Sequence, residues 1–444
     1  MTRLLRDRAP ARGIEMSHVA IIGLGYVGLP LLLAFRDAGY EVVGIDIDPE
    51  KIEKLKRGES YLSHIPPEAI QSRLDDKTTL STDMSAIQKA SAVIIAVPTP
   101  LTDDMTPDLS YIESTAEQIA RYLAAGQLVS LESTTYPGTT RDVVIPILER
   151  DSGLKAGEDF FVAFSPERVD PGDPDHDLTM IPKIVAGLDE KSLQMAVDLY
   201  SRITPEVVPV STLEAAEMAK LLENIYRSVN IALVNEMKML ADVMGLNIWE
   251  VIAAASTKPF GFQAFYPGPG LGGHCLPIDP FYLYWIGKTR YDFETQFIEL
   301  AGRINSEMPQ YVLKRLLGAM EERGKEIDGA TILLIGIAYK PDISDTRESP
   351  GLKLISMLEE IGARVSYHDS FVPVLPPTRD YPGLAGRNSV DLEADTIGEY
   401  DLVVIVANHS NVDYGLLGRN ASLIIDTRNA MMDFSGEGAE VIRS

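Results

Sequence analysis

The sequence predicts an α/β protein in which two doubly wound domains are joined by a long central helix and a helical middle domain. Three observations support this fold class. Strand-like and helix-like segments alternate from His18 onward, as in parallel sheets covered by helices. A helical pattern without proline then extends from about residue 211 to Gly245. Apolar strand segments return afterwards, at residues 331–340, 363–369, 401–408 and 421–429.

Length and composition agree with several folded domains. The chain has 444 residues, about three times the length of a typical domain of roughly 150 residues. Apolar residues make up 45% and charged residues 24%, which is typical of a globular protein and excludes a collagen-like or wholly disordered chain. We expect domains at residues 17–205, 206–323 and 324–444, with residues 1–16 as a disordered extension.

Charge and cysteine content exclude several kinds of function. A net charge of -25 disfavours a nucleic-acid partner, because a polyanion would be repelled. One cysteine cannot form an internal disulfide, and six histidines without ligand spacing predict no metal site. No segment approaches the roughly 20 apolar residues of a membrane span, and the chain start lacks the apolar core of a signal peptide. We therefore expect a soluble, cytoplasmic protein without a membrane partner.

The first domain begins with a nucleotide-binding pattern. A strand at VAIIGLG leads through Gly23, Gly25 and Gly28 into a helix at about residues 27–38, and a strand at EVVGID follows. Glycines at this spacing let a pyrophosphate approach the helix N-terminus, which indicates a Rossmann-like fold. We expect the loop, with Tyr26 and Val27, to contact the cofactor. Further strands are expected at residues 92–97, 128–132 and 161–163.

Asp46 predicts which dinucleotide binds. It ends the second strand, eighteen residues after Gly28, where a carboxylate can accept hydrogen bonds from both ribose hydroxyls. The same carboxylate would repel a 2′-phosphate, so NAD is favoured over NADP. The alternative is a structural glycine turn with an exposed aspartate.

The long helix is predicted to join two domains. Residues 211–214 have the Ser-x-x-Glu form of a capping box, and at 1.5 Å per residue the helix would span about 50 Å. That length exceeds the core of one small domain and offers a surface for a second subunit. Lys220 and Asn224 share one face of this helix. They point to a polar site, although a solvated face remains an alternative at this stage.

The single cysteine lies in a glycine-rich loop. Residues 267–279 read PGPGLGGHCLPID, so Cys275 follows four glycines. Glycines remove side chains from one wall and let a substrate approach backbone N–H groups and the sulfur together, which favours a nucleophile over an inert buried thiol. A dyad with His274 is disfavoured because the side chains of adjacent residues usually diverge.

Seven motifs in order resemble one enzyme family. They are GLGYVGLP, AVPTP, ESTTYPGTT, FSPERVDPG, KLLENIYRSVNIALVNE, GPGLGGHCLPIDP and AYKPDISDTRESP, and they extend over residues 17–430. Together they resemble the UDP-glucose/GDP-mannose dehydrogenase family, in particular its UDP-sugar 6-dehydrogenases. The resemblance implies oxidation of the C6 alcohol of a nucleotide sugar to a carboxylate with two NAD.

The resemblance also implies residue roles. Cys275 would attack the aldehyde formed by the first oxidation, and the second oxidation would leave a thioester that water hydrolyses. Lys220 and Asn224 would stabilise negative charge on the substrate oxygen, and Asp279 would place water or tune Lys220. Glu167 and Thr134 would handle protons and water. Implied NAD contacts are Lys51, Thr99, Thr134 and Arg347, and implied substrate contacts are Glu167, Arg168, Lys220, Asn224, Tyr266, Gly272, Lys340 and Arg428.

The substrate implied is a UDP-N-acetylhexosamine. Glucose-type members often carry a lysine after the position of Pro277, where this chain has Ile278. The motifs ESTTYPGTT, SPERVDPG and GGHCLPIDP resemble the branch that acts on UDP-N-acetylglucosamine or its galactosamine epimer, with UDP-N-acetylmannosamine and UDP-glucose as alternatives. Two other readings are a one-step hydroxyacid or sugar-acid dehydrogenase, which would not need Cys275, and a nucleotide-binding scaffold without turnover. A homodimer or higher homo-oligomer through the central helices is expected.

Overall fold

The structure is a computed structural model that describes residues 17–62, 65–102, 104–168, 180–273, 275–436 and 438–444. The expected extension at residues 1–16 lies outside this part, and so does His274. The chain forms two compact units, Met1–Glu223 and Asn224–Ser444. The division into three domains therefore stays a prediction.

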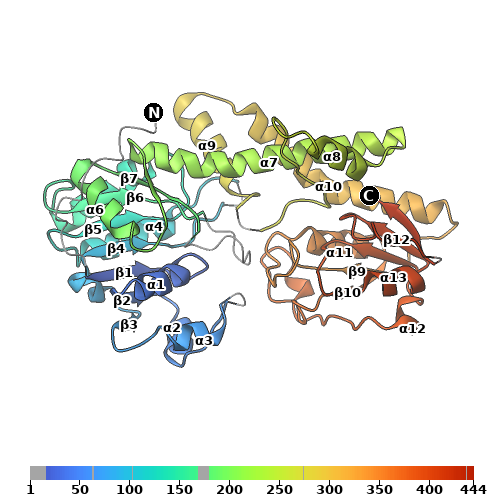
Figure 1. Ribbon diagram of the computed structural model, residues 1–444, viewed down its shortest axis with the longest axis horizontal. Helices are drawn as coiled ribbons and strands as arrows, with labels where there is room; N and C mark the ends of the chain where they lie inside the picture. Colours follow the sequence, from blue (N-terminus) through green and yellow to red (C-terminus); the bar gives the residue numbers. More distant parts are fainter. Residues whose placement is uncertain (1–16, 63–64, 103, 169–179, 274, 437) are drawn as a thin grey trace. The chain divides into compact units, whose positions relative to one another are not determined.

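The first unit alternates strands and helices (Figure 1). Its elements are β1 (His18–Ile22), α1 (Gly28–Asp37), β2 (Glu41–Ile45), α2 (Pro49–Lys56), α3 (Pro67–Gln71), β3 (Thr78–Ser81), η1 (Met84–Lys89), β4 (Ala92–Ile95), α4 (Ser110–Ala120), β5 (Leu128–Leu131), η2 (Thr140–Val144), α5 (Ile145–Ser152), β6 (Phe161–Phe164), β7 (Lys183–Gly187), α6 (Glu190–Tyr200), β8 (Val207–Pro209) and the start of α7 (Leu213–Met244).

Its strands form one sheet in the order β3-β2-β1-β4-β5-β6-β7-β8. Neighbouring strands are parallel except β6 and β7, which are antiparallel. Both faces of the central strands are buried, so each strand is mostly apolar in the sequence. On one face, Val19 and Ile21 of β1 share a core with Phe35 of α1 and Leu199 of α6. The strand order changes direction at β1 and β4, which is where doubly wound sheets bind nucleotides.

The long helix occurs as predicted, with a different cap. α7 contains 32 residues, which corresponds to about 48 Å at 1.5 Å per residue. The Thr212 hydroxyl accepts a hydrogen bond from the backbone N–H of Ala215 at 3.1 Å, so the cap is Thr212 and not Ser211. Glu214, the expected partner of Ser211, forms an ion pair with Arg141 at 2.6 Å.

The second unit holds the rest of α7, three helices that follow it in the chain, and a smaller sheet with its own helices (Figure 1). Its elements are α8 (Ile248–Ser256), α9 (Asp279–Tyr291), α10 (Gln296–Glu321), β9 (Thr331–Ile335), α11 (Pro350–Glu360), β10 (Arg364–His368), η3 (Pro382–Leu384), α12 (Ala394–Ile397), β11 (Leu402–Ile405), α13 (Tyr414–Asn420), β12 (Leu423–Asp426) and β13 (Glu440–Arg443).

The second sheet is parallel throughout, with the order β10-β9-β11-β12-β13. One face, including Leu334 of β9, packs on Leu316 of α10 and Ile355 of α11. The other face, including Leu333, packs on Leu417 of α13 and on α12. The predicted fold class, with two Rossmann-like sheets and a long central helix, is thus confirmed. Within the described residues, no helix is long and apolar enough to cross a membrane.

Candidate active site

The glycine loop after β1 has the shape of a dinucleotide cradle. Gly23 has φ +90°, and a Cβ added there would lie 2.5 Å from the carbonyl oxygen of Ala96. A Cβ on Gly28 would lie 1.8 Å from the carbonyl oxygen of Gly23. A Cβ on Gly25 would meet no atom within 4 Å. Two glycines are therefore required by the turn and its packing, and the third leaves open space where a pyrophosphate can approach, so the loop fits NAD.

Asp46 follows β2 and is buried beside this loop. Its Oδ2 accepts a hydrogen bond from the backbone N–H of Leu24 at 2.9 Å, and its Oδ1 accepts one from Asp48 at 3.0 Å. Lys51, an implied NAD contact, forms an ion pair with Asp46 at 3.2 Å. A carboxylate has about four acceptor positions, so Oδ1 retains one for a ribose hydroxyl. Tyr61 was not predicted; its hydroxyl donates to the carbonyl oxygen of Leu24 at 2.5 Å.

The remaining predicted residues of the first unit follow neighbouring parallel strands. Thr99 follows β4, Thr134 follows β5, and Glu167 and Arg168 follow β6. The carboxyl ends of parallel strands meet at one edge of a sheet, which is the edge that carries the glycine loop. Arg168 forms a two-pronged ion pair with Glu223 of α7, at 2.6 and 3.2 Å. The loop after β6 is thereby tied to α7.

A second glutamate ties α7 to the loop after β5. The buried carboxylate of Glu217 accepts hydrogen bonds from the backbone N–H of Gly138 at 2.6 Å, and from the N–H and hydroxyl of Thr140 at 2.9 and 2.7 Å. Burial raises the pKa of Glu217 to about 7, although these three donors act in the opposite direction. Lys220 lies on α7 between Glu217 and Glu223, and it is buried. Among the described residues it has no hydrogen bond or ion pair, which leaves its ammonium for a ligand.

In the second unit, Cys275 precedes the start of α9. The thiol is exposed, and the carbonyl oxygen of Cys275 accepts hydrogen bonds from the N–H groups of Asp279 at 2.8 Å and Ile278 at 3.2 Å. Asp279 is buried, and Asn224 donates to its Oδ2 at 2.5 Å. Three predicted catalytic residues of this unit are therefore held close together.

The glycines of the cysteine loop are explained by close packing, and not by the predicted access for a substrate. A Cβ on Gly268 would lie 2.4 Å from the Arg428 guanidinium, and a Cβ on Gly272 would lie 2.4 Å from the Cβ of Tyr339. A Cβ on Gly273, which has φ +79°, would meet the ring of Tyr339 at 2.9 Å. These positions lack side chains because the loop packs against residues that follow β9 and β12. The expectation that they clear a path for substrate is not needed to explain them.

Buried amides that sequence reasoning missed hold the start of this loop. Asn235 of α7 accepts a hydrogen bond from the N–H of Gly268 at 3.0 Å, and its amide donates to Asn305 of α10 at 3.0 Å. Asn305 in turn donates to the carbonyl oxygen of Ser228 at 3.0 Å. Asn224, Ser228 and Asn235 lie four and seven residues apart, on one helix face. Polar residues at helical spacing within an apolar stretch could have indicated Ser228 and Asn235. We used this pattern to predict only Lys220 and Asn224.

The cations expected at the UDP end lie in loops after strands of the second sheet. Arg428 follows β12 and its Nε donates to the carbonyl oxygen of Val406 at 2.8 Å. Burial lowers the pKa of Arg428 to about 10 despite nearby Asp426. Lys340 lies in the turn after β9, and Arg347 forms an ion pair with Asp345 at 2.6 Å. Keeping the charged guanidinium of Arg428 away from water is costly unless an anion pairs with it. Arg428 is therefore suited to bind an anionic ligand.

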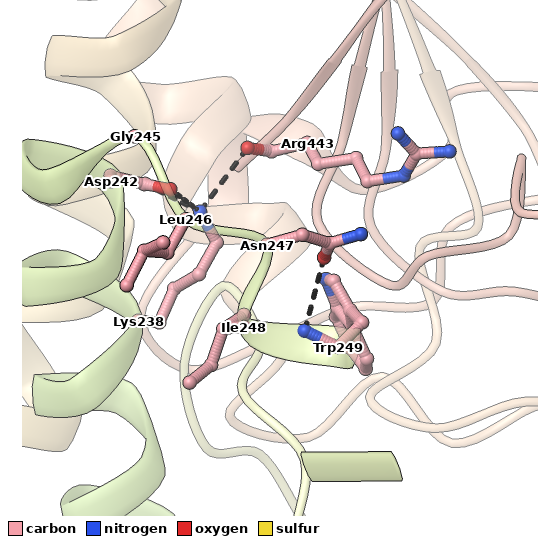
Figure 2. Close-up of a pocket in the computed structure, with 8 residues that line it drawn as sticks. All are labelled: Lys238, Asp242, Gly245, Leu246, Asn247, Ile248, Trp249 and Arg443. Atoms are coloured by element: carbon pink, nitrogen blue, oxygen red, sulfur yellow. Dashed lines mark hydrogen bonds and ion pairs between the residues drawn. The ribbon is translucent and has the colours of Figure 1, made fainter. Parts of the chain in front are cut away.

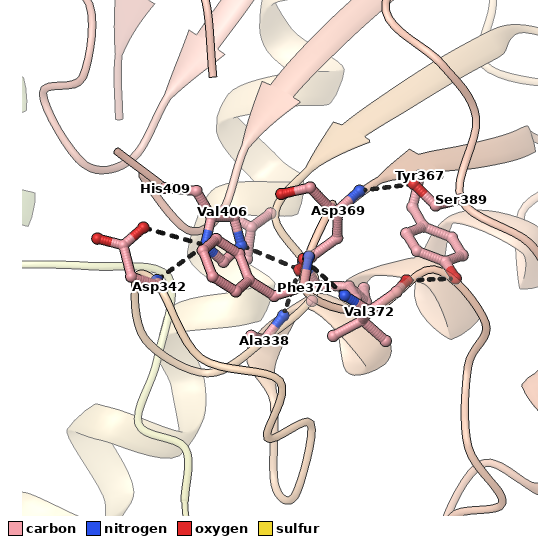
Figure 3. A network of polar contacts seen from close by, with 12 residues as sticks. Ala338, Asp342, Tyr367, Asp369, Phe371, Val372, Ser389, Val406 and His409 are labelled. Atoms are coloured by element: carbon pink, nitrogen blue, oxygen red, sulfur yellow. Dashed lines mark hydrogen bonds and ion pairs between the residues drawn. The ribbon is translucent and has the colours of Figure 1, made fainter. Parts of the chain in front are cut away.

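Asp369 shows how the second sheet differs from the first (Figure 3). Like Asp46, it follows the second strand of its sheet, and its Oδ2 accepts from the N–H groups of Ile337 at 2.7 Å and Ala338 at 3.0 Å. His409 Nε2 also donates to Oδ2, at 3.0 Å, because Nδ1 accepts the N–H of Asp342. Two further backbone N–H groups donate to Oδ1. With five donors this carboxylate is saturated, so other groups of this sheet must hold its ligand.

The second unit contains a pocket (Figure 2). It is lined by Lys238 and Asp242 of α7, Trp249 of α8 and Arg443 of β13. Lys238 pairs with Asp242 and donates to the carbonyl oxygen of Arg443 at 3.1 Å. Tyr266, an implied substrate contact, stacks on Trp249 with ring centroids 5.8 Å apart. No cluster of three or more metal-ligand side chains occurs among the described residues.

Two nucleotide-type sheets, a dinucleotide cradle and an exposed cysteine just before α9 define the class as a nicotinamide-dependent oxidoreductase. Profiles of one family match the chain in order: its NAD binding domain at residues 17–204, its central domain at 214–307 and its UDP binding domain at 333–433. The chain belongs to the UDP-glucose/GDP-mannose dehydrogenase family. The predictions of a NAD-dependent UDP-sugar dehydrogenase and of a NAD-binding domain are confirmed.

Relatives cover nearly the whole chain. A UDP-N-acetyl-D-mannosamine dehydrogenase of Pyrococcus horikoshii is 36% identical over 94% of this chain and 96% of its own length. A UDP-N-acetyl-D-glucosamine 6-dehydrogenase of Pseudomonas aeruginosa is 34% identical over 88% and 90%. The solved Pyrococcus horikoshii structure has a TM-score of 0.86 at 34% identity, covering 96% of this chain and 98% of that one. The mannosamine and glucosamine enzymes are thus about equally similar to this chain.

Proposed function

We propose that this protein oxidises the C6 alcohol of a UDP-N-acetylhexosamine, with UDP-N-acetylglucosamine as the first candidate, to the uronic acid. The observation that carries the proposal is that Cys275, just before α9, is hydrogen-bonded through its carbonyl oxygen to Asp279, whose buried carboxylate accepts a hydrogen bond from Asn224. UDP-N-acetylmannosamine is the second candidate, favoured by the 36% identity to the mannosamine enzyme of Pyrococcus horikoshii.

The proposed chemistry has two oxidations and one hydrolysis. NAD, when bound, accepts the hydride in each oxidation. Glu167, with Thr134, takes the proton of the C6 hydroxyl through water, and the Cys275 thiolate then adds to the aldehyde carbon. Loss of a second hydride leaves a thioester on Cys275. Water attacks its carbonyl carbon, the C–S bond breaks, and the uronic acid leaves with the thiol regenerated.

Charge on the substrate oxygen is the second element of the proposal. A tetrahedral oxyanion forms at C6 in both the thiol addition and the hydrolysis. Lys220 and Asn224 would stabilise it, and Asp279 fixes the amide of Asn224 by accepting its N–H at 2.5 Å. The lack of a protein partner for the Lys220 ammonium among the described residues supports this role.

The nucleotide groups are assigned to separate loops. Gly23, Gly25, Tyr26, Val27, Gly28, Asp46, Lys51, Thr99 and Arg347 would hold NAD. Arg168, Lys340 and Arg428 would neutralise the UDP diphosphate, with Tyr266 and Gly272 near the substrate. The buried Arg428 supports this assignment, because a phosphate repays its desolvation.

The domain and assembly assignments are part of the proposal. Residues 17–205 would bind NAD, residues 206–323 would carry the nucleophile and the dimer contact, and residues 324–444 would bind UDP. A cytoplasmic location would keep the single cysteine reduced.

A panel of UDP-sugars tests the proposal. NADH formation followed by absorbance should give the highest kcat/KM for a UDP-N-acetylhexosamine, at least about tenfold above UDP-glucose, which is roughly 1.4 kcal/mol of transition-state discrimination. A preference for UDP-glucose would contradict the N-acetyl assignment. Turnover of hydroxyacids without UDP-sugar turnover would favour the one-step dehydrogenase, and binding without turnover would favour a scaffold.

A further inference from the structure

A buried polar cluster lies directly behind Glu167 in the first unit. The ammonium of Lys183, the first residue of β7, lies 2.8 Å from Glu132 Oε2 and 3.3 Å from Glu167 Oε2. Glu132 follows β5 and accepts a second hydrogen bond, from the Tyr200 hydroxyl of α6, at 2.6 Å. The Tyr200 hydroxyl also contacts Ser130 of β5 at 2.8 Å. One lysine therefore bridges Glu132 to the carboxylate proposed to take the substrate proton.

The charges of this cluster interact strongly because the cluster is buried. The side chains of Glu132 and Lys183 are 0% and 4% exposed, whereas that of Glu167 is 13% exposed. Charges in such a low-dielectric place interact more strongly than surface pairs, and breaking one contact is costly. Only Glu167 reaches the solvent side of the cluster. Lys183 and Glu132 are therefore placed to influence the reaction through Glu167 and not by touching substrate.

Two carboxylates of the described residues, those of Glu132 and Glu167, share the ammonium of Lys183. Arg168 contributes its backbone N–H to Glu167 Oε1 at 2.7 Å, but its guanidinium pairs with Glu223. Burial raises the pKa of Glu132, while Lys183 and Tyr200 oppose the shift. The pKa of Lys183 is raised by Glu132 and Glu167 although burial opposes it. Lys183 thus stays charged, and its charge is divided between two carboxylates.

We infer that Lys183 is a positioning residue that holds Glu167 ionised and in place for proton uptake, and that Glu132 sets how much of the Lys183 charge acts on Glu167. This inference rests on the proposed function of Glu167. An ammonium within about 4 Å favours the ionised form of a carboxylate by about 1–3 pKa units. A second carboxylate on the same ammonium weakens that effect. Removing Lys183 and removing the charge of Glu132 should therefore act in opposite directions.

The test is the pH dependence of kcat for NADH formation with the UDP-sugar at saturating NAD. Lys183→Met should move the acidic limb to higher pH by about 1–3 units, because Glu167 becomes easier to protonate. Glu132→Gln should move the same limb to lower pH, because Lys183 then acts on Glu167 alone. Lys183→Arg should restore the limb toward its original position. Lys191→Met, which removes an exposed lysine whose ammonium lies 4.0 Å from the Phe161 ring centroid, should leave the limb unchanged.

Opposite shifts support the inference, and shifts in the same direction, or none in folded variants, overturn it. If Lys183→Met fails to fold, Glu132→Gln decides alone: a shift to lower pH supports the inference and any other result overturns it. Glu167→Gln separates this inference from the proposed function. Full activity of Glu167→Gln would contradict the proposed role of Glu167 itself. If Glu167→Gln loses activity but the acidic limb of the pH profile does not shift in the Lys183 and Glu132 variants, only the role inferred for Lys183 is contradicted.

Discussion

At the scale of single residues, the proposed chemistry depends on Cys275, the only cysteine of the chain, which comes just before α9. Cys275 was identified because the only thiol follows four glycines. Lys183 and Glu132 were missed because a buried charged pair and a solvated surface pair have the same sequence signature. The partner of Lys183 is 51 residues away in the chain, so no local pattern connects them.

Cys275→Ser should abolish uronic acid formation while both ligands still bind. A serine hydroxyl is a much weaker nucleophile at neutral pH, and an ester would replace the thioester. We expect product formation to fall at least about a hundredfold, with NAD and UDP-sugar dissociation constants changed by less than about threefold. Mass spectrometry of the product and calorimetric titration measure the two effects. Release of uronic acid at near wild-type rate would show that the covalent mechanism is wrong.

At the scale of elements, the long helix and most buried strands were recognisable. The buried strand β7 and the edge strands β3, β8 and β13 were not, although the edge strand β10 was. β1, β4, β5, β9, β11 and β12 are apolar runs buried on both faces, which is why the sequence predicted them. β3, β8 and β13 are short edge strands with partly exposed residues, so they lack that pattern. The attachment of α7 to the loops after β5 and β6 also depends on contacts distant in sequence, through Glu217 and Glu223.

The Glu217 attachment predicts a specific pH dependence. Its folded pKa of about 7 lies above the ordinary 4.5, so the folded state binds this proton more tightly than the unfolded state does. The stability that this proton contributes is present below pH 4.5 and is lost as pH rises to about 7, by up to about 3 kcal/mol. The free energy of unfolding of the wild type, relative to Glu217→Gln, should therefore fall between pH 5 and pH 8.

Urea unfolding at the two pH values measures this difference. Glu214→Gln is the matched control one turn earlier on α7, because the Arg141 hydrogen bond lowers the pKa of Glu214 against the effect of burial. That contribution is lost as pH falls, so its pH dependence should have the opposite sign. A wild-type advantage over Glu217→Gln that is constant, or that grows with pH, would disprove the buried-carboxyl account of this contact.

At the scale of the whole molecule, the net charge of -25 opposes the binding of anionic ligands. An acidic protein that binds two diphosphates must gather positive charge locally. Arg168 and Arg347 are paired with carboxylates in this structure, whereas Lys220 and Arg428 have no ion pair among the described residues. The latter two are therefore the best placed to meet anionic ligand groups directly.

The exposed face of α7 predicts a homodimer. Large apolar residues recur on it at spacings of three, four and seven, and they are at least a third exposed: Leu222, Tyr226, Leu233, Met237, Leu240 and Met244. Such a stripe on a long helix is typical of a helix–helix interface. The double substitution Met237→Glu and Leu240→Glu should convert a dimer to a monomer in sedimentation velocity. Val374→Glu, at an exposed valine away from α7, should not; an unchanged mass for the double variant would contradict this interface.

The central claim is that one protein molecule performs two successive oxidations on each sugar. The most direct measurement counts NADH formed per UDP-sugar consumed, with limiting UDP-N-acetylhexosamine, excess NAD and the product identified by mass. The account predicts two NADH per sugar and a uronic acid as the only final product. One NADH per sugar, with an aldehyde or ketone as the product, would contradict it.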